Sequence, residues 1–192
     1  MLCQDRKTAA VEVYSPTARR FHWWTVAFIL VQVPIGVIMH ERGERNIWDG
    51  LTNSLYSLHK LIGILILVLI VARLVYRLRH GAPADEPTLE WWQKAAAHVT
   101  HWGLYALLLA LPVTGWAAIS LFDARDIFGL VSLPAISPVD QAGHARAIFT
   151  HKVLVFLLIL ALAAHIGAAL FHHLIRKDGV LTRMLPGLRK KG

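Results

Sequence analysis

Cysteine is almost absent from this chain, because Cys3 is the only one among its 192 residues. One cysteine excludes a disulfide framework within the chain and the four-thiolate ligand set of an iron–sulfur cluster. The C-x-x-C-H motif is missing as well, so a haem attached through thioether bonds is excluded. Any haem in this protein is therefore held non-covalently.

Charged side chains are also scarce. They make up 17% of the residues, against roughly 25% in an average soluble domain, while hydrophobic residues make up 56%. The apolar residues gather into four runs: residues 23–39, 95–122 and 153–175 carry no Asp, Glu, Lys or Arg, and residues 51–72 carry only Lys60. Since about 20 apolar residues in a helix cross a bilayer, each run is long enough to span one.

These runs predict an all-α fold, a four-helix transmembrane bundle. We expect a single membrane domain over residues 1–192, with helices at about 17–40, 51–79, 91–122 and 147–176. A soluble bundle is the alternative, but four such runs leave few polar faces for water. The first run lies behind a polar segment and has no small-residue cleavage site after it, which argues against a cleaved signal peptide.

The distribution of positive charge predicts the orientation. A net charge of +8 is compatible with nucleic-acid binding, but 14 of the 20 Lys and Arg residues would lie on the side that holds both termini. The six on the opposite side are Arg42, Arg45, Lys60, Arg125, Arg146 and Lys152. By the positive-inside rule both termini are cytoplasmic. The basic flanks then favour anionic lipid as a partner, and nucleic acid is not expected.

Histidines within the predicted spans form two layers. His59 and His151 lie toward the outer ends of the second and fourth helices, and His22 enters the first helix from the cytoplasm. His165 follows His151 by 14 residues, or about 21 Å along a helix axis. Two heptads return to nearly the same stripe of a bundled helix. The fourth helix therefore offers one imidazole to an outer layer with His59 and one to an inner layer with His22.

Two imidazoles on opposite sides of one iron are the ligand set of a six-coordinate haem, and bundle cores hold such sites between helices. Structural zinc sites instead need four ligands at one level. We therefore expect two haems b, with His59 and His151 on the outer iron and His22 and His165 on the inner iron. Two haems stacked across the bilayer would relay electrons through it.

Other histidines leave alternatives open. His172 lies on the same stripe as His165 and could replace it as a ligand, but an iron-to-iron distance of about 31 Å would then slow electron transfer. Otherwise its N–H could serve a quinone head group or a haem propionate. His101, three residues after His98, fits the same two uses as well as interfacial packing, and less readily ligation.

The sequence around these histidines resembles that of the bacterial cytochrome b561 family. The matching stretches are RRFHWW around His22, SLHKLIGILILVLIVARLVYRLRH, AHVTHWGLYALLLALPVTGW, and THKVLVFLLILALAAHIGAALFHHLIRKDGVLTRMLP, which together cover most of residues 19–186. The resemblance implies a four-helix fold in the bacterial inner membrane, two b haems on the four histidines named above, and electron exchange with ubiquinone.

The resemblance also implies an activity. Members close to this pattern act as superoxide oxidases, which pass the electron of superoxide to ubiquinone, and we expect an oxidoreductase of that kind with a small anionic donor on the periplasmic side. Lys60 and Lys152, directly after the outer ligands, would attract such a donor, pair with propionates or anchor lipid head groups. Alternatively the chain is the cytochrome b subunit of a larger dehydrogenase or hydrogenase complex and receives electrons from a redox protein. A transporter is disfavoured, because charged residues are missing from the longest runs.

Overall fold

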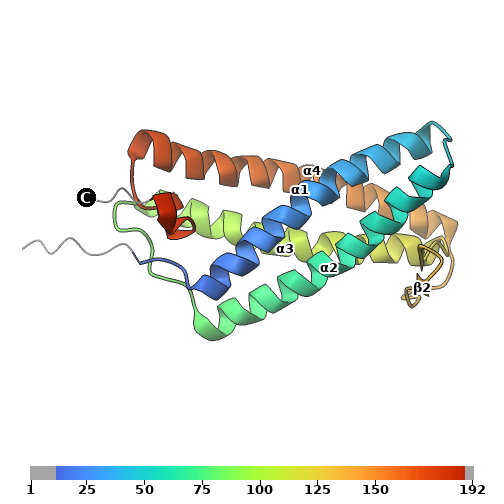
Figure 1. The fold of residues 1–192 in the computed structure, drawn as a ribbon, viewed down its shortest axis with the longest axis horizontal. Coiled ribbons are helices and arrows are strands. Elements are labelled where there is room, and N and C mark those ends of the chain that lie inside the picture. The colour runs from blue at the N-terminus through green and yellow to red at the C-terminus, as the bar shows by residue number, and fades with distance from the viewer. Residues whose placement is uncertain (1–11, 189–192) are drawn as a thin grey trace, which may run out of the picture.

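The computed structural model describes residues 12–188, most of which form four long helices that lie side by side (Figure 1). The helices are α1 (Pro16–Glu44), α2 (Gly50–His80), α3 (Trp91–Leu121) and α4 (Gln141–Phe171). All four are long and apolar enough to cross a membrane. The predicted all-α, four-helix transmembrane bundle is confirmed, with one small β-hairpin added to it. Cys3 and the basic residues Arg6, Lys7, Arg189, Lys190 and Lys191 lie outside the described residues.

The bundle has two distinct ends. The segment before α1, the α2–α3 loop and the residues after α4 lie together at one end, called here the terminal end (Figure 1). At the opposite end, the hairpin end, strands β1 (Asp126–Ile127) and β2 (Val131–Ser132) pair antiparallel. Phe128 (φ 55°) and Gly129 (φ 70°) make the left-handed turn between them.

Two helix boundaries differ from the prediction. The fourth helix begins at Gln141 and not near residue 147, because the Asp140 carboxylate caps it by accepting the N–H of Ala142 at 3.0 Å. The first helix continues to Glu44. Its last turn is tied to α2, since Arg42 donates to the Thr52 hydroxyl (2.7 Å) and to the Asp49 carboxylate (2.6 Å).

The centre of the bundle is a narrow apolar core. Ile62, Ile66 and Ile70 are buried and recur every four residues, so they form one stripe of α2. They pack with buried residues of the other helices: Ile35, Tyr105, Leu108, Leu111 and Leu158. Large apolar side chains also cover the outside of the bundle, for example Leu30 (69% exposed) and Val68 (63%). Such a surface is suited to lipid and not to water.

Beyond Phe171 the chain folds across the terminal end through η1 (His172–Arg176), a π-helical turn, and two short 3₁₀ turns, η2 (Leu181–Arg183) and η3 (Pro186–Leu188). Arg183 is buried and donates to the carbonyl oxygens of Glu12 (2.9 Å) and Ala84 (2.5 Å). It thereby joins the segment before α1 to the α2–α3 loop. Trp23 of α1 donates its indole N–H to the Met184 carbonyl at 3.3 Å.

Candidate functional site

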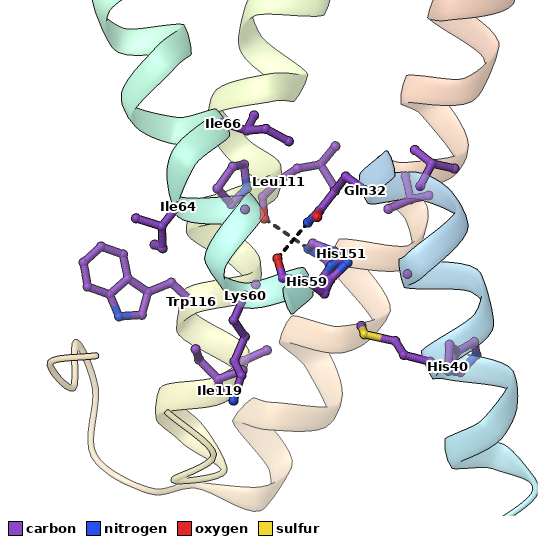
Figure 2. A pocket seen from close by; sticks show the side chains of 18 of the residues that line it. Gln32, His40, His59, Lys60, Ile64, Ile66, Leu111, Trp116, Ile119 and His151 are labelled. Atoms are coloured by element: carbon purple, nitrogen blue, oxygen red, sulfur yellow. Dashed lines mark hydrogen bonds between the residues drawn. The ribbon is translucent and has the colours of Figure 1, made fainter. Parts of the chain in front are cut away.

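In the half of the bundle nearer the hairpin end, α2 and α4 bring the rings of His59 and His151 close together. Their ring centres are 6.4 Å apart and the ring planes are inclined by 75°. Both rings line a cavity of about 350 Å³ whose walls are mostly apolar, including Leu111 and Ile66 (Figure 2). The two histidines predicted for the outer layer are therefore neighbours.

The imidazole of His151 is held by α3. Its Nδ1 lies 3.1 Å from the Leu111 carbonyl and 3.2 Å from the Thr114 hydroxyl. Because a carbonyl oxygen only accepts, Nδ1 carries the hydrogen and Nε2 is left to bind a metal. The ring also lies against Gly115, where a Cβ would be 3.3 Å from the His151 Cε1.

The imidazole of His59 packs against α1 at a glycine. A Cβ at Gly36 would come within 2.9 Å of the His59 Cε1, so a larger residue there would displace the ring. Gln32, one turn earlier, donates its amide N–H to the His59 carbonyl at 3.0 Å (Figure 2). The Nδ1 of His59 is buried and has no hydrogen-bond partner among residues 12–188.

In the other half of the bundle three imidazoles converge from three helices. The ring centres of His22 (α1) and His165 (α4) are 6.2 Å apart. His101 of α3 also lies close to His165, with 5.4 Å between ring centres. His98, one turn earlier, instead faces the α2–α3 loop, where its Nε2 lies 3.3 Å from the exposed Asp85 carboxylate.

Two arginines of α2 place positive charge beside this second group. Arg73 Nη2 lies 3.3 Å from His22 Nδ1, and its guanidinium stands 5.3 Å from the ring centre of Tyr105. The Arg77 guanidinium stands 5.8 Å from the ring centre of Trp102. Neither arginine forms an ion pair with a carboxylate of the residues that the structure describes.

The separations within the two pairs fit an iron held between two imidazoles. A metal–imidazole bond is about 2.0 Å long and the ring centre lies about 1.2 Å behind the nitrogen, so two opposed ligands have ring centres about 6 Å apart. The observed values are 6.4 and 6.2 Å. Within residues 12–188 no three His, Cys, Asp or Glu side chains are placed to share one metal ion, as a structural zinc site would need.

Comparison with known proteins decides the family. The model of the prokaryotic cytochrome b561 family matches residues 13–187, almost the whole of the described chain. The chain belongs to the prokaryotic cytochrome b561 family. The resemblance inferred from sequence is therefore confirmed.

Relatives in this family cover most of the chain. Cytochrome b561 homolog 1 of Escherichia coli K12 is 33% identical over 90% of this chain and 97% of its own length. Cytochrome b561 homolog 2 of the same strain is 31% identical over 93% and 94%. A Yersinia pestis protein named probable superoxide oxidase CybB is 35% identical over 70% of this chain and 76% of its own length.

Family membership establishes the general function. The chain is a multi-pass bacterial membrane protein that binds b-type haem and transfers electrons through the membrane. It is an oxidoreductase of the cytochrome b561 family and acts in lipid with a redox partner.

His172, predicted as a quinone or propionate candidate, lies at the terminal end of this cytochrome. Its ring is buried and meets Phe171 edge-on at 5.6 Å between centres. Nδ1 lies 2.5 Å from the Asp178 carboxylate, which is 5% exposed. The structure therefore distinguishes the two candidates for a quinone or propionate site. His101 lies beside His165, whereas His172 is paired with the Asp178 carboxylate nearer the terminal end.

The two lysines that follow the hairpin-end histidines have different contacts. The Lys60 ammonium donates to the carbonyl oxygens of Ala124 (3.1 Å) and Asp126 and so fastens the hairpin segment to α2. Lys152 Nζ lies 4.0 Å from the Glu44 carboxylate. Both line a second, more polar cavity of about 890 Å³ at the hairpin end.

This second cavity adjoins the first. Tyr56 stacks on Trp48 on its wall, with 5.5 Å between ring centres, and the ring of His144 stacks on Phe122 at 4.7 Å. The side chains that line both cavities are His40, Tyr56, Lys60, Ile119, Ile148 and Lys152. The hairpin-end cavity is therefore an approach to the space around His59 and His151.

Several of these residues were missed by the sequence reasoning. In the sequence Arg73 is one of many basic residues that flank the spans and is not distinguished from them. Its spacing from Arg77 nevertheless puts both on one face of α2. Asp178 is close to His172 because a π-turn returns the chain, and no sequence pattern predicted that turn. Gly36 carried a signal, since glycine inside a membrane helix often marks close packing.

Proposed function

We propose that this cytochrome carries single electrons across the bacterial inner membrane through two b haems and delivers them to ubiquinone. His59 and His151 would hold one haem and His22 and His165 the other. The proposal rests on two pairs of imidazoles, each with one member on α4. The ring centres within the pairs are 6.4 and 6.2 Å apart. The haem irons, when bound, supply a six-coordinate Fe(III)/Fe(II) couple that takes up and releases one electron.

The protein contributes the positions of these ligands. Leu111 and Thr114 orient His151, and Gly36 gives His59 its place against α1. Because α4 supplies one histidine to each pair, the two sites are fixed relative to one another, about 21 Å apart along that helix. His22 lies next to His165, and this supports His165 over His172 as the second ligand.

We place the terminal end in the cytoplasm on the basis of the charge bias, so the hairpin end faces the periplasm. Superoxide is the proposed donor there. Two superoxide anions would lose one electron each to become O₂, and ubiquinone would take up two electrons and two protons to become ubiquinol. Support comes from the probable superoxide oxidase among the relatives and from Lys60 and Lys152 at the cavity. His101 and His172, at the other end, remain candidates for binding the quinone or a propionate.

A subunit role in a larger dehydrogenase or hydrogenase is the second candidate. The observation in its favour is the exposed apolar surface of the hairpin segment, where Leu130 is 84% exposed and Val131 61%. A redox protein could dock there and donate electrons in place of superoxide. Copurification of such a protein at a fixed ratio from the native membrane would favour this alternative.

The test begins with the purified protein alone. An optical spectrum with pyridine haemochrome quantification should give two b haems per chain, and a missing Soret band or a single haem contradicts the proposal. Superoxide-dependent reduction of ubiquinone should then proceed with no partner present. The double variant Lys60→Ala/Lys152→Ala should slow superoxide-driven haem reduction several-fold at low salt, since steering by charge is screened at high salt. An unchanged rate and salt dependence would remove these lysines from the donor site.

A further inference from the structure

The chain leaves α4 by a turn that brings an acidic residue back to the helix it has just left. Residues His172–Arg176 form the π-helical turn η1, and Lys177 takes a left-handed conformation (φ 55°). The N–H groups of Lys177 and Asp178 then both donate to the His172 carbonyl. This reversal places the Asp178 side chain beside the imidazole of His172. Single π-turns within α-helices occur often at functional sites.

The carboxylate of Asp178 has two partners. One oxygen lies 2.5 Å from His172 Nδ1, and the other accepts the N–H of Val180 at 3.1 Å. The side chains of His172 and Asp178 are only 10% and 5% exposed, so this contact is shielded from water. Because the carboxylate accepts, Nδ1 carries a hydrogen and the orientation of the ring is fixed. Nε2, the second nitrogen, has no hydrogen bond within residues 12–188.

The position of this Asp–His pair fits a step that needs protons. His172 follows His165 by seven residues, or about 10 Å along a helix. It therefore lies between the ligand pair nearer the terminal end and the surface of that end. An acceptor reduced there by two electrons also takes up two protons, and an imidazole is the side chain that most readily exchanges them near neutral pH.

We propose that Asp178 is a positioning residue that fixes His172 so that its Nε2–H donates protons to the quinone during reduction. The inference rests on the proposed function, because it requires ubiquinone at this end. In its imidazolium form His172 carries a hydrogen on both nitrogens, and for each electron that arrives one Nε2–H proton passes to a quinone oxygen. The neutral imidazole then regains a proton from water at the terminal end. Two such cycles balance the two electrons and two protons of ubiquinol.

The alternative is that the pair only fastens the chain reversal. Asp178→Asn separates the two roles, because its amide oxygen still accepts from Nδ1–H while the negative charge that stabilises a protonated imidazole is lost. A matched control is Asp85→Asn. Asp85 also pairs with a histidine at the terminal end, at 3.3 Å from His98, but on the exposed surface.

The experiment is a single turnover that needs no physiological donor. Each variant is reduced with dithionite, freed of excess reductant and mixed with short-chain ubiquinone, and haem reoxidation is followed optically in H₂O and D₂O. In Asp178→Asn we expect unchanged haem content and half-saturating quinone concentration, a limiting rate lower by about tenfold to a hundredfold and a larger solvent isotope effect. Asp178→Ala should lose at least as much, and Asp85→Asn should match the parent protein.

The outcomes separate the inference from the function. If the parent protein, with both haems, is not reoxidised by ubiquinone, the proposed function fails. If it is reoxidised and Asp178→Asn keeps the parent limiting rate and isotope effect, the role of Asp178 fails while the function stands. An equal slowing in Asp85→Asn, or a loss in Asp178→Asn that only follows lost haem, also overturns the inference.

Discussion

The two histidine pairs have nearly the same separation but different surroundings. His59 and His151 lie beside an apolar cavity; of the two lysines on its wall, Lys60 donates to two backbone carbonyls, which leave its charge in place, and Lys152 lies 4.0 Å from the Glu44 carboxylate. At the other pair, the Arg73 guanidinium lies 3.3 Å from the His22 ring. The similarity lies in the spacing of the imidazoles, and the difference lies in the charge around them.

This difference bears on the direction of electron flow. Positive charge near a redox centre stabilises its reduced form, since reduction adds negative charge. Under the proposed function the haem nearer the terminal end would hold an electron more strongly than the haem nearer the hairpin end. Electrons would then run downhill from the hairpin end to the terminal end, toward the side where we place the quinone.

The largest effect should come from removing ligands. His151→Ala and His22→Ala should each bind one haem per chain where the parent binds two, because one imidazole cannot replace the lost partner. His172→Ala should keep both haems. Pyridine haemochrome quantification and the reduced spectrum measure this. Loss of a haem in His172→Ala but not in His165→Ala would reverse the choice of ligand.

The next effect should be confined to the hairpin-end pair. Gly36→Ala puts a Cβ 2.9 Å from the His59 ring, and we expect about tenfold weaker binding of that haem. Gly167→Ala is the matched control on α4, since its added Cβ meets nothing within 4 Å. Haem titration of apoprotein gives both affinities. Equal affinities for the two variants would mean that the His59 ring moves freely.

Removing a positive charge should affect the His22–His165 pair more than the His59–His151 pair. Arg73→Gln should lower the reduction potential of the terminal-end haem, because one unit charge at about 7 Å and an effective dielectric of about 20 is worth about 2 kcal/mol, or at most about 100 mV. Arg79→Gln, at an exposed position of the same helix, should shift it far less. Redox titration followed optically distinguishes the two haems. A shift of the hairpin-end haem instead would exchange the assignment of the two sites.

The smallest effect concerns the α1–α2 connection at the hairpin end. The Thr52 backbone N–H, helped by Arg42, lowers the pKa of the exposed Asp49 carboxyl from 3.8 to about 2. A carboxyl whose pKa is lowered in the folded protein stabilises the fold at pH values above its unfolded-state pKa. This stabilisation is lost as the pH falls from about 4 toward 2. Asp49→Asn should therefore show a shallower loss of thermal stability over that range. Identical melting curves against pH would exclude a contribution from this cap.

Much of the site could be predicted because helix periodicity fixes depth. The spacing of 14 positions from His151 to His165 places them in two layers, and the charge-free runs place the helices. The start of α4 was missed because residues 141–146 are not strongly apolar, although Asp140 is a common capping residue.

Features that depend on side-chain direction or on irregular backbone could not be predicted. The i,i+3 spacing of His98 and His101 did not reveal that one faces Asp85 and the other His165. Lys60 was expected to meet a donor, a haem propionate or a lipid head group; the structure adds its contacts with two carbonyls of the hairpin segment, whose fold no sequence pattern predicted. Asp178 depends on a π-turn that only the structure shows.

The buried Arg183 implies an order of assembly. It joins Glu12 and Ala84, yet it follows all four helices in the chain and is therefore synthesised after them. The Lys60 contact with Ala124, in contrast, needs only α2, α3 and the start of the next segment. During synthesis the hairpin end can thus be fastened while the terminal end is still open. The terminal end is therefore the last part of the bundle to close.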